Sequence, residues 1–189
     1  MGGTVAAGAA LSGGARADEG DGPPVAESDR VLGPEAVRIT IALNGENRTL
    51  DVEPRVTLLD LLRSSLDLTG AKKICDRGAC GGCTVLLDGE PVNSCLVLAI
   101  DADGREVRTV EGLAADGALT PLQEEFVRHD ALQCGFCTPG FVMSCHALLS
   151  RNPDPTEAEV RAACAGNICR CGAYSGVLAA AMAAAKRRR

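Results

Sequence analysis

The chain has 189 residues and a formal net charge of −6, with 46% hydrophobic and 23% charged residues. These proportions are typical of a folded protein rather than a disordered tail. The acidic balance argues against a nucleic-acid partner, and no stretch reaches the roughly 18–20 apolar residues of a membrane span. Because aromatic residues make up only 2% of the chain, Ala, Leu and Val must fill the core. The ten cysteines of the chain are candidates for additional cross-links that stabilise such a core.

Residues 1–34 are rich in Gly, Ala, Asp and Pro without periodicity, which predicts a flexible leader. Within it, the mildly apolar residues 3–12 precede Ala15-Arg16-Ala17, a pattern typical of the end of an export signal. The positively charged front of such a signal is missing. Two interpretations stay open: the remnant of an export signal or a plain Gly/Ala leader. We expect a periplasmic protein if an upstream twin-arginine leader exists, and a cytoplasmic protein otherwise.

Residues 35–112 show the pattern of a small mixed sheet with one helix across it. Val37, Ile39 and Ile41 alternate with polar or small residues, Asn44-Gly45 indicates a hairpin turn, and a second strand follows at residues 48–53. Thr57 precedes a leucine-rich helical segment that extends to Leu66. A second hairpin is expected over residues 84–93, turning at Asp88-Gly89, followed by an apolar run at residues 95–100 and a final strand at 107–110.

Residues 113–189 indicate four helices. Pro121 suits the first turn of a helix that ends near Asp130, and Thr138-Pro139 begins a second one that reaches about Ser150. Thr156 and Glu159 form a capping box for a third helix, which ends near Gly166. An Ala-rich fourth helix is expected from Tyr174 or Ser175 to Lys186. The predicted class is therefore α+β, with a sheet domain followed by an all-α four-helix domain.

The first half contains four cysteines in the order C-x₄-C-x₂-C, followed by a fourth cysteine after eleven further residues. This spacing is that of a plant-type ferredoxin loop for one [2Fe–2S] cluster. Glycines 78, 81 and 82 can adopt positive φ and let backbone N–H groups approach the sulfurs, and Lys72, Lys73 and Arg77 could offset the negative charge of the cluster. Zinc is the alternative, but zinc sites usually use two paired knuckles. The expected ligands are Cys75, Cys80, Cys83 and Cys95.

The second half contains Cys134-Gly135-Phe136-Cys137 and, after 31 intervening residues, Cys169-Arg170-Cys171. A single C-x₂-C also occurs in zinc sites and redox dithiols. Here each pair comes just before a predicted helix, so two helix N-termini would offer free N–H groups and partial positive charge to four thiolates. This pattern favours a second iron–sulfur site and leaves zinc as the alternative.

Together, the two cysteine sets resemble the iron–sulfur subunit or domain of the xanthine oxidase family of molybdenum hydroxylases. The motifs that carry the resemblance are C-x₄-C-x₂-C-x₁₁-C, the segment Gln133 to Gly140 and the segment Gly166 to Cys171, and the match extends from about Val37 to Met182. The resemblance implies a β-grasp ferredoxin-like domain over 35–112 and a helical [2Fe–2S]-binding domain over 113–189.

The resemblance also implies a division of labour in an oxidoreductase complex, for example a heterotrimer. A large subunit would carry the molybdopterin cofactor and hydroxylate an aldehyde or an N-heterocycle. This chain, without catalytic residues of its own, would pass electrons through two [2Fe–2S] clusters to a FAD subunit or another acceptor. Gln133 would contact the molybdopterin, with Cys171 close to its edge, and the ferredoxin-like cluster would face the acceptor. The alternative function is that of a free-standing two-cluster ferredoxin-type carrier.

Several residues stand outside these motifs. Gly172-Ala173-Tyr174 replaces the Thr-Gly-Tyr of many relatives and resembles the periplasmic aldehyde oxidoreductases. Cys145 and Cys164 belong to neither ligand set and are expected to be buried free thiols within helices, while a disulfide between them would require export. His129 and His146 lack a carboxylate or serine partner at useful spacing, so a structural role is expected for both.

Overall fold

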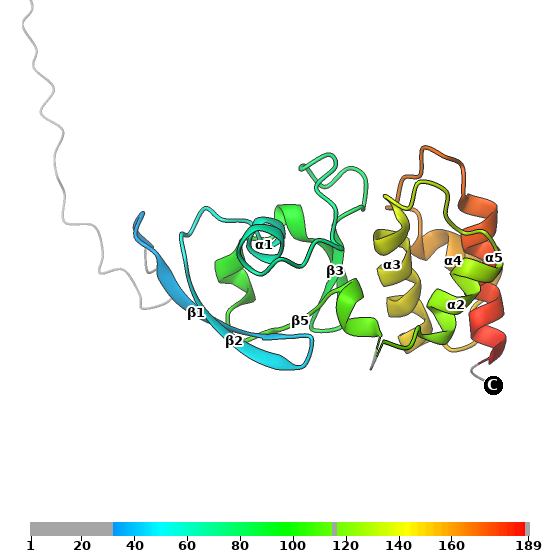
Figure 1. The fold of residues 1–189 in the computed structure, drawn as a ribbon, viewed down its shortest axis with the longest axis horizontal. Helices are drawn as coiled ribbons and strands as arrows, with labels where there is room; N and C mark the ends of the chain where they lie inside the picture. Colours follow the sequence, from blue (N-terminus) through cyan, green and yellow to red (C-terminus); the bar gives the residue numbers. More distant parts are fainter. Residues whose placement is uncertain (1–31, 115–116, 188–189) are drawn as a thin grey trace, which may run out of the picture. The chain divides into compact units, whose positions relative to one another are not determined.

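The computed structural model describes residues 32–114 and 117–187, and the chain from Leu32 onward forms one compact unit. The signal-like pattern at residues 3–17 lies outside the described residues. No described helix is long and apolar enough to cross a membrane. A sheet-containing half is followed by a helical half (Figure 1), which confirms the α+β class.

In the described part of the chain, five strands form one mixed sheet in the order β2-β1-β5-β3-β4. Its outer pairs are antiparallel hairpins, whereas β5 runs parallel to β1 and antiparallel to β3. Both predicted hairpin turns are confirmed, and their residues Asn44, Gly45, Asp88 and Gly89 all have positive φ, as two-residue turns of this type require. The strands are β1 (Val37–Leu43), β2 (Glu46–Val52), β3 (Thr84–Leu87), β4 (Glu90–Asn93) and β5 (Glu106–Arg108).

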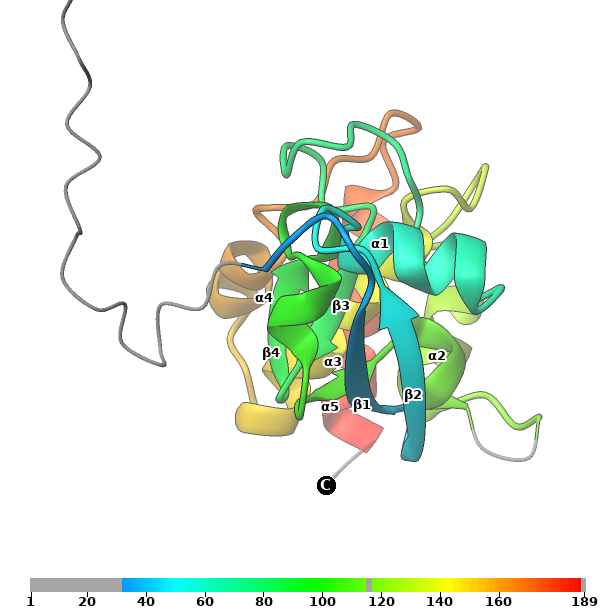
Figure 2. The same ribbon diagram turned by 90° about the vertical axis from the view of Figure 1, so that its left-hand side faces the viewer.

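One helical segment packs on this sheet, as predicted (Figure 2). It begins as α1 (Leu58–Asp60) and continues as the π-helical turn η2 (Leu61–Ser65). The hydroxyl of Thr57 caps it by accepting a hydrogen bond from the backbone N–H of Asp60 at 3.1 Å. Its buried leucines share a core with alternate residues of β1 and with β3 and β5, including Leu58, Leu59, Leu61, Leu62, Ile39, Ile41, Val85 and Val107.

The segments after β4 differ from the sequence prediction. The apolar run at 95–100 is not a regular element but forms parts of two 3-10 helices, η3 (Ser94–Leu96) and η4 (Ala99–Ala102). Strand β5 ends at Arg108, and Val110 already belongs to the 3-10 helix η5 (Val110–Leu113). Short apolar runs without clear periodicity are compatible with strand or helix, so pattern alone could not assign them.

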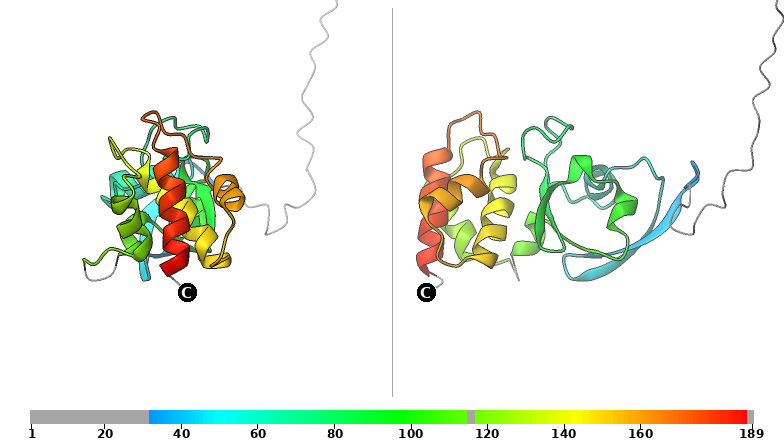
Figure 3. Two further views of the ribbon diagram at one scale, coloured as in Figure 1. Left: turned by 90° about the vertical axis from the view of Figure 1, so that its right-hand side faces the viewer. Right: turned by 180° about the vertical axis from the view of Figure 1, so that it is seen from behind.

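Within residues 117–187, four α-helices make up the second half (Figure 3), close to their predicted positions. Thr120 and Thr156 each cap a helix through a complete capping box. The core between the helices contains both aromatic and small side chains, among them Phe126, Phe141, Met143, Val160, Ala180, Ala181 and Ala184. The helices are α2 (Pro121–Arg128), α3 (Thr138–Arg151), α4 (Glu157–Ala163) and α5 (Tyr174–Arg187).

A buried carboxylate ties the end of α5 to α2. Glu125 is only 4% exposed, and Arg187 donates to its Oε1 at 3.0 Å. Arg128 also pairs with Glu125 at 3.0 Å, and His129 Nε2 lies 3.4 Å from its Oε2. The expectation that His129 has no carboxylate partner is therefore wrong. The contact belongs to a structural ion-pair group, since Glu125 lies at the α2–α5 junction.

Candidate metal centres

Three cysteines of the first set lie in the long loop between η2 and β3, and the fourth lies in η3. The loop turns back on itself at Gly78 and Gly81, whose φ values are 71° and 66°. This confirms the predicted role of these two glycines. Gly82 does not have positive φ; its missing Cβ instead makes room for Ile74, whose Cδ1 would lie 2.3 Å from such an atom.

Backbone N–H groups point at the sulfurs of this loop. Gly78 N–H donates to Cys95 Sγ at 3.2 Å, and Ala79 N–H donates to Cys75 Sγ at 3.3 Å. The amide of Asn93 supports the turn by donating to the carbonyl oxygen of Gly78 at 3.2 Å. N–H donors stabilise a thiolate more than a thiol, so the loop is built to hold negatively charged sulfur.

The four thiols of the first set form two pairs, Cys75 with Cys80 and Cys83 with Cys95. The pKa of Cys75 is lowered to about 7, first by the backbone N–H of Arg77 and then by the thiol of Cys80. Burial raises the pKa of Cys83 to about 11, and its partner thiol is Cys95. Cys83 and Cys95 are buried, whereas Cys75 and Cys80 are half-buried, so the inner pair is the more shielded from solvent.

The second set lies where two helices begin. Cys137 is the N-cap of α3, and Cys169 and Cys171 lie in the turn before α5, which confirms the predicted placement at two helix N-termini. Ala173 N–H donates to Cys169 Sγ at 3.4 Å. The backbone N–H of Cys169 itself donates to the hydroxyl oxygen of Tyr174 at 2.9 Å, and the ring of Tyr174 packs edge-on against Phe141.

The second set is also arranged as two pairs of thiols. Cys134 lies beside Cys171, and both are exposed. Cys137 lies beside Cys169, and burial followed by this contact raises the pKa of Cys137 to about 12. One pair is therefore directed toward solvent and the other toward the protein interior.

The donor sets fit diiron clusters. A [2Fe–2S] cluster takes four thiolates, two on each iron, whereas a structural zinc ion gathers four ligands around one point. Each cysteine set supplies two thiol pairs with nearby N–H donors. Within residues 32–114 and 117–187, no three or more His, Cys, Asp or Glu side chains are arranged to hold a single ion.

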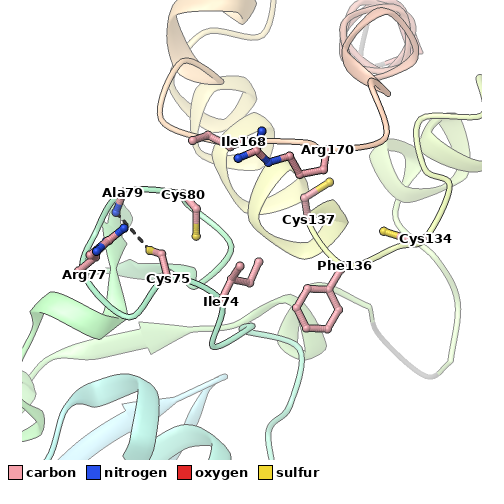
Figure 4. A pocket seen from close by; sticks show the side chains of 10 residues that line it. All are labelled: Ile74, Cys75, Arg77, Ala79, Cys80, Cys134, Phe136, Cys137, Ile168 and Arg170. Atoms are coloured by element: carbon pink, nitrogen blue, oxygen red, sulfur yellow. Dashed lines mark hydrogen bonds between the residues drawn. The ribbon is translucent and has the colours of Figure 1, made fainter.

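A cavity of about 650 Å³ lies between the two cysteine loops (Figure 4). Cys75 and Cys80 line it from the first loop, and Cys134 and Cys137 line it from the second. Of the three predicted cations, Arg77 lines this cavity, whereas Lys73 is paired with Asp60 and Asp76 and Lys72 donates to the carbonyl oxygen of Thr69. The rest of its wall consists of a second cation, Arg170, and of four apolar side chains, Ile74, Ala79, Phe136 and Ile168.

The two loops are joined by direct hydrogen bonds. The backbone N–H of Ile168 donates to the carbonyl oxygen of Cys80 at 2.9 Å. The side chain of Asn167 donates to Gly81 O at 2.9 Å and accepts from Ser144 Oγ at 2.8 Å. Ile168 directly precedes Cys169. The backbones of Cys80 and Cys169, which are candidate ligands of different sets, are therefore separated by one hydrogen bond and one residue.

The assignment of the eight cysteines as ligands stays a prediction, and sequence reasoning missed Asn167 and the hydroxyl of Tyr174 as supporting groups. The signal for Asn167 was its place inside Gly166-Asn167-Ile168-Cys169, where a buried amide would need partners. Gln133, predicted to contact a cofactor on a partner, is exposed next to Cys134, which leaves it accessible to another molecule.

Two family models match the chain. Residues 41–114 match the "2Fe-2S iron-sulfur cluster binding domain", and residues 109–182 match the "[2Fe-2S] binding domain". The nicotine 6-hydroxylase small subunit of Paenarthrobacter nicotinovorans is 53% identical over 78% of this chain and 89% of that protein. The aldehyde oxidoreductase iron-sulfur-binding subunit PaoA of Escherichia coli (strain K12) is 44% identical over 78% of this chain and 71% of that protein.

Solved structures agree with these matches. A chain of quinoline 2-oxidoreductase from Pseudomonas putida 86 superimposes with a TM-score of 0.78 at 46% identity, covering 82% of this chain and 98% of that one. The aldehyde oxidoreductase from Desulfovibrio desulfuricans ATCC 27774 also gives a TM-score of 0.78, at 44% identity, but only 17% of that chain is covered. The same fold thus occurs as nearly a whole chain and as one part of a longer chain.

Proposed function

Because the chain belongs to the small iron–sulfur subunits of the molybdenum hydroxylases, we propose that its eight paired cysteines hold two [2Fe–2S] clusters. Each bound cluster supplies one-electron redox chemistry. The chain would carry electrons from a large molybdopterin-binding subunit toward a FAD subunit or another acceptor. The first ligand set is Cys75, Cys80, Cys83 and Cys95, and the second is Cys134, Cys137, Cys169 and Cys171.

The observation that carries this proposal is the direct link between the two loops. Ile168 N–H and Cys80 O are 2.9 Å apart, so the ligand loops are connected through backbone rather than through mobile side chains. Cys169 directly follows Ile168, so the inner thiol pair Cys137 and Cys169 adjoins this connection, whereas Cys134 and Cys171 form the exposed pair. This order gives the chain an outer end for receiving electrons and an inner route for passing them on.

The apolar rim of the cavity beside the second site is the proposed docking face for the large subunit. Phe136 is 51% exposed and Ile168 is 45% exposed, although both line the cavity beside the cysteines. Exposed apolar side chains grouped around a functional site favour a protein contact. Gln133, next to Cys134, would then reach the molybdopterin of the partner through its amide.

For the substrate of the complex, we propose an N-heterocycle. The nicotine 6-hydroxylase small subunit shares 53% identity with this chain, against 44% for the aldehyde oxidoreductase subunit. The chain itself would not determine this choice, because the substrate would bind on the large subunit.

For location, the signal-like residues 3–17 support export if a twin-arginine segment precedes them. Fractionation of cells expressing the gene with its upstream region tests export; recovery only from the cytoplasm contradicts it.

Co-purification tests the function directly. The tagged chain, expressed with the genes adjacent to its own, should elute with a large molybdenum-containing chain. Addition of an N-heterocyclic substrate should then bleach the visible absorption of the iron–sulfur clusters. Elution of a red-brown chain on its own would instead indicate a free-standing two-cluster carrier, and a colourless zinc-containing chain would contradict both functions.

A matched pair of variants tests the docking face. Phe136→Glu places a charge on the proposed contact surface and should abolish co-elution with the large chain, whereas Phe136→Leu keeps the surface apolar and should preserve it. Both variants should retain the visible spectrum, because Phe136 is not a ligand. If Phe136→Glu still co-elutes with the large chain, Phe136 is not part of the docking face and the proposed surface is wrong.

A further inference from the structure

Two cysteines that neither ligand set uses face each other inside the helical half. Cys145 lies on α3 and Cys164 caps the C-terminus of α4. Their sulfurs are 3.5 Å apart, and the two residues are 0% and 7% exposed. We propose that Cys145 and Cys164 form a redox-active pair that hydrogen peroxide converts into an intramolecular disulfide.

The position of the pair brings the two sulfurs close to bonding distance. The two sulfurs must approach from 3.5 Å to about 2.0 Å, the length of a disulfide bond. They come from different helices that share one core, so rotation of two short side chains supplies most of the movement. The resulting bond would link α3 to the end of α4.

The two thiols are unequal in access and in acidity. Cys164 lines a cavity of about 290 Å³, whose wall also includes Arg161 and Tyr174, whereas Cys145 is completely buried. The hydrogen bond from the Cys145 thiol lowers the pKa of Cys164, and the same contact, followed by burial, raises the pKa of Cys145. Peroxide is small enough to enter such a cavity, so Cys164 would react first and Cys145 second.

The proposed chemistry has two balanced steps. The Cys164 thiolate attacks one oxygen of H₂O₂; the O–O bond breaks, hydroxide leaves, and Cys164 becomes a sulfenic acid. Cys145 then attacks the Cys164 sulfur, the S–S bond forms, and the sulfenic oxygen leaves as water with the Cys145 proton. Overall, two thiols and one H₂O₂ give one disulfide and two waters.

The disulfide would anchor the segment that connects the two candidate centres. The backbone N–H of Asn167 donates to the carbonyl oxygen of Cys164 at 2.9 Å, and Asn167 in turn contacts Gly81. The segment from Cys164 to Ile168 is thus held at both ends. The pairing of Cys145 with Cys164 depends on these two thiols alone and would occur whether or not the other eight cysteines bind iron.

Alkylation of the full chain tests the proposal. The cluster-loaded protein is treated anaerobically with one equivalent of H₂O₂, the remainder is removed with catalase, and all accessible thiols are alkylated in denaturant with a chelator. The reduced chain should carry ten alkyl groups, one for each cysteine, and the oxidised chain should carry eight, with fragment spectra that join Cys145 to Cys164. Dithiothreitol should restore ten. Ten groups after peroxide, or a link between other cysteines, would overturn the proposal.

Two variants test the order of reaction. Cys145→Ala lacks the second thiol, so the Cys164 sulfenic acid should accumulate and react with dimedone. Cys164→Ala lacks the reactive thiol, so all nine remaining cysteines should still be alkylated after peroxide. Circular dichroism verifies that each variant folds, and the corresponding Ser variants replace any that does not. A dimedone adduct on Cys145 in Cys164→Ala would contradict the assigned order.

Discussion

Asn167 is the side chain that fastens one cysteine loop to the other. It is 4% exposed, and it both donates to Gly81 O and accepts from Ser144 Oγ. A buried amide with partners for both of its ends is stabilising, whereas a buried group that has lost its partner is costly. The position should therefore tolerate little change.

Replacement of Asn167 by Asp tests this role. The carboxylate can still accept the hydrogen bond from Ser144 Oγ, but it cannot donate one to Gly81 O. Its second oxygen would instead face the carbonyl oxygen of Gly81, so that two acceptors oppose each other. We expect the free energy of unfolding to fall by about 2–3 kcal/mol, measured by chemical denaturation. The control Asn47→Asp, at an exposed site on β2, should change it by less than about 0.5 kcal/mol. Equal effects at the two sites would contradict the role of Asn167.

The hydroxyl of Tyr174 is a second supporting group, since it accepts the N–H of Cys169 at 2.9 Å. In Tyr174→Phe the ring contact with Phe141 is retained, but this N–H becomes available to sulfur at the second site. Hydrogen bonds to cluster sulfurs influence reduction potentials, so we expect the potential of the second cluster to rise while that of the first is unchanged. An EPR-monitored redox titration measures both, and a shift of both or of neither would argue against this role.

At the scale of the elements, the first turn of α3 lies directly against the first cysteine loop. A Cβ at Gly140 would be 2.2 Å from the backbone oxygen of Gly81, an atom that cannot move aside easily. Gly140→Ala should therefore lower the free energy of unfolding by about 1–3 kcal/mol and broaden the EPR signals. Gly166→Ala is the control, because nothing lies within 4 Å of the added atom. A neutral Gly140→Ala variant would contradict close packing of α3 against the first cysteine loop.

The elements that the sequence predicted well are those whose conformation is determined by residues within the element or directly beside it. The hairpins depend on Asn44-Gly45 and Asp88-Gly89, and the third helix depends on the capping box of Thr156 with Glu159, all of which lie within a few residues of the structure they produce. The 3-10 helices at 94–102 have no such signal. Their conformation depends on contacts with distant residues, for example the hydrogen bond from Leu58 N–H to the carbonyl oxygen of Val97, which lies between the two 3-10 helices. The local sequence pattern does not indicate such contacts.

At the scale of the molecule, the two halves have separate cores but a shared boundary at the cysteine loops. Cysteine spacing indicated the two sets because the cysteines of the first are close in sequence and those of the second form two close pairs, each before a predicted helix. The contact between the sets was not predictable from pattern. Asn167 and Gly81 are 86 residues apart; α3 packs against β3, which follows Gly81, and Ser144 of α3 contacts Asn167.

We propose that eight cysteines hold two separate [2Fe–2S] clusters in one chain. Quantitative EPR of the anaerobically purified protein after full reduction with dithionite tests it most directly. The two thiol sets differ in exposure and in N–H donors, so they should give two distinguishable S = 1/2 signals that integrate together to two spins per chain. One signal that integrates to a single spin, or no signal from a zinc-containing chain, would contradict the claim.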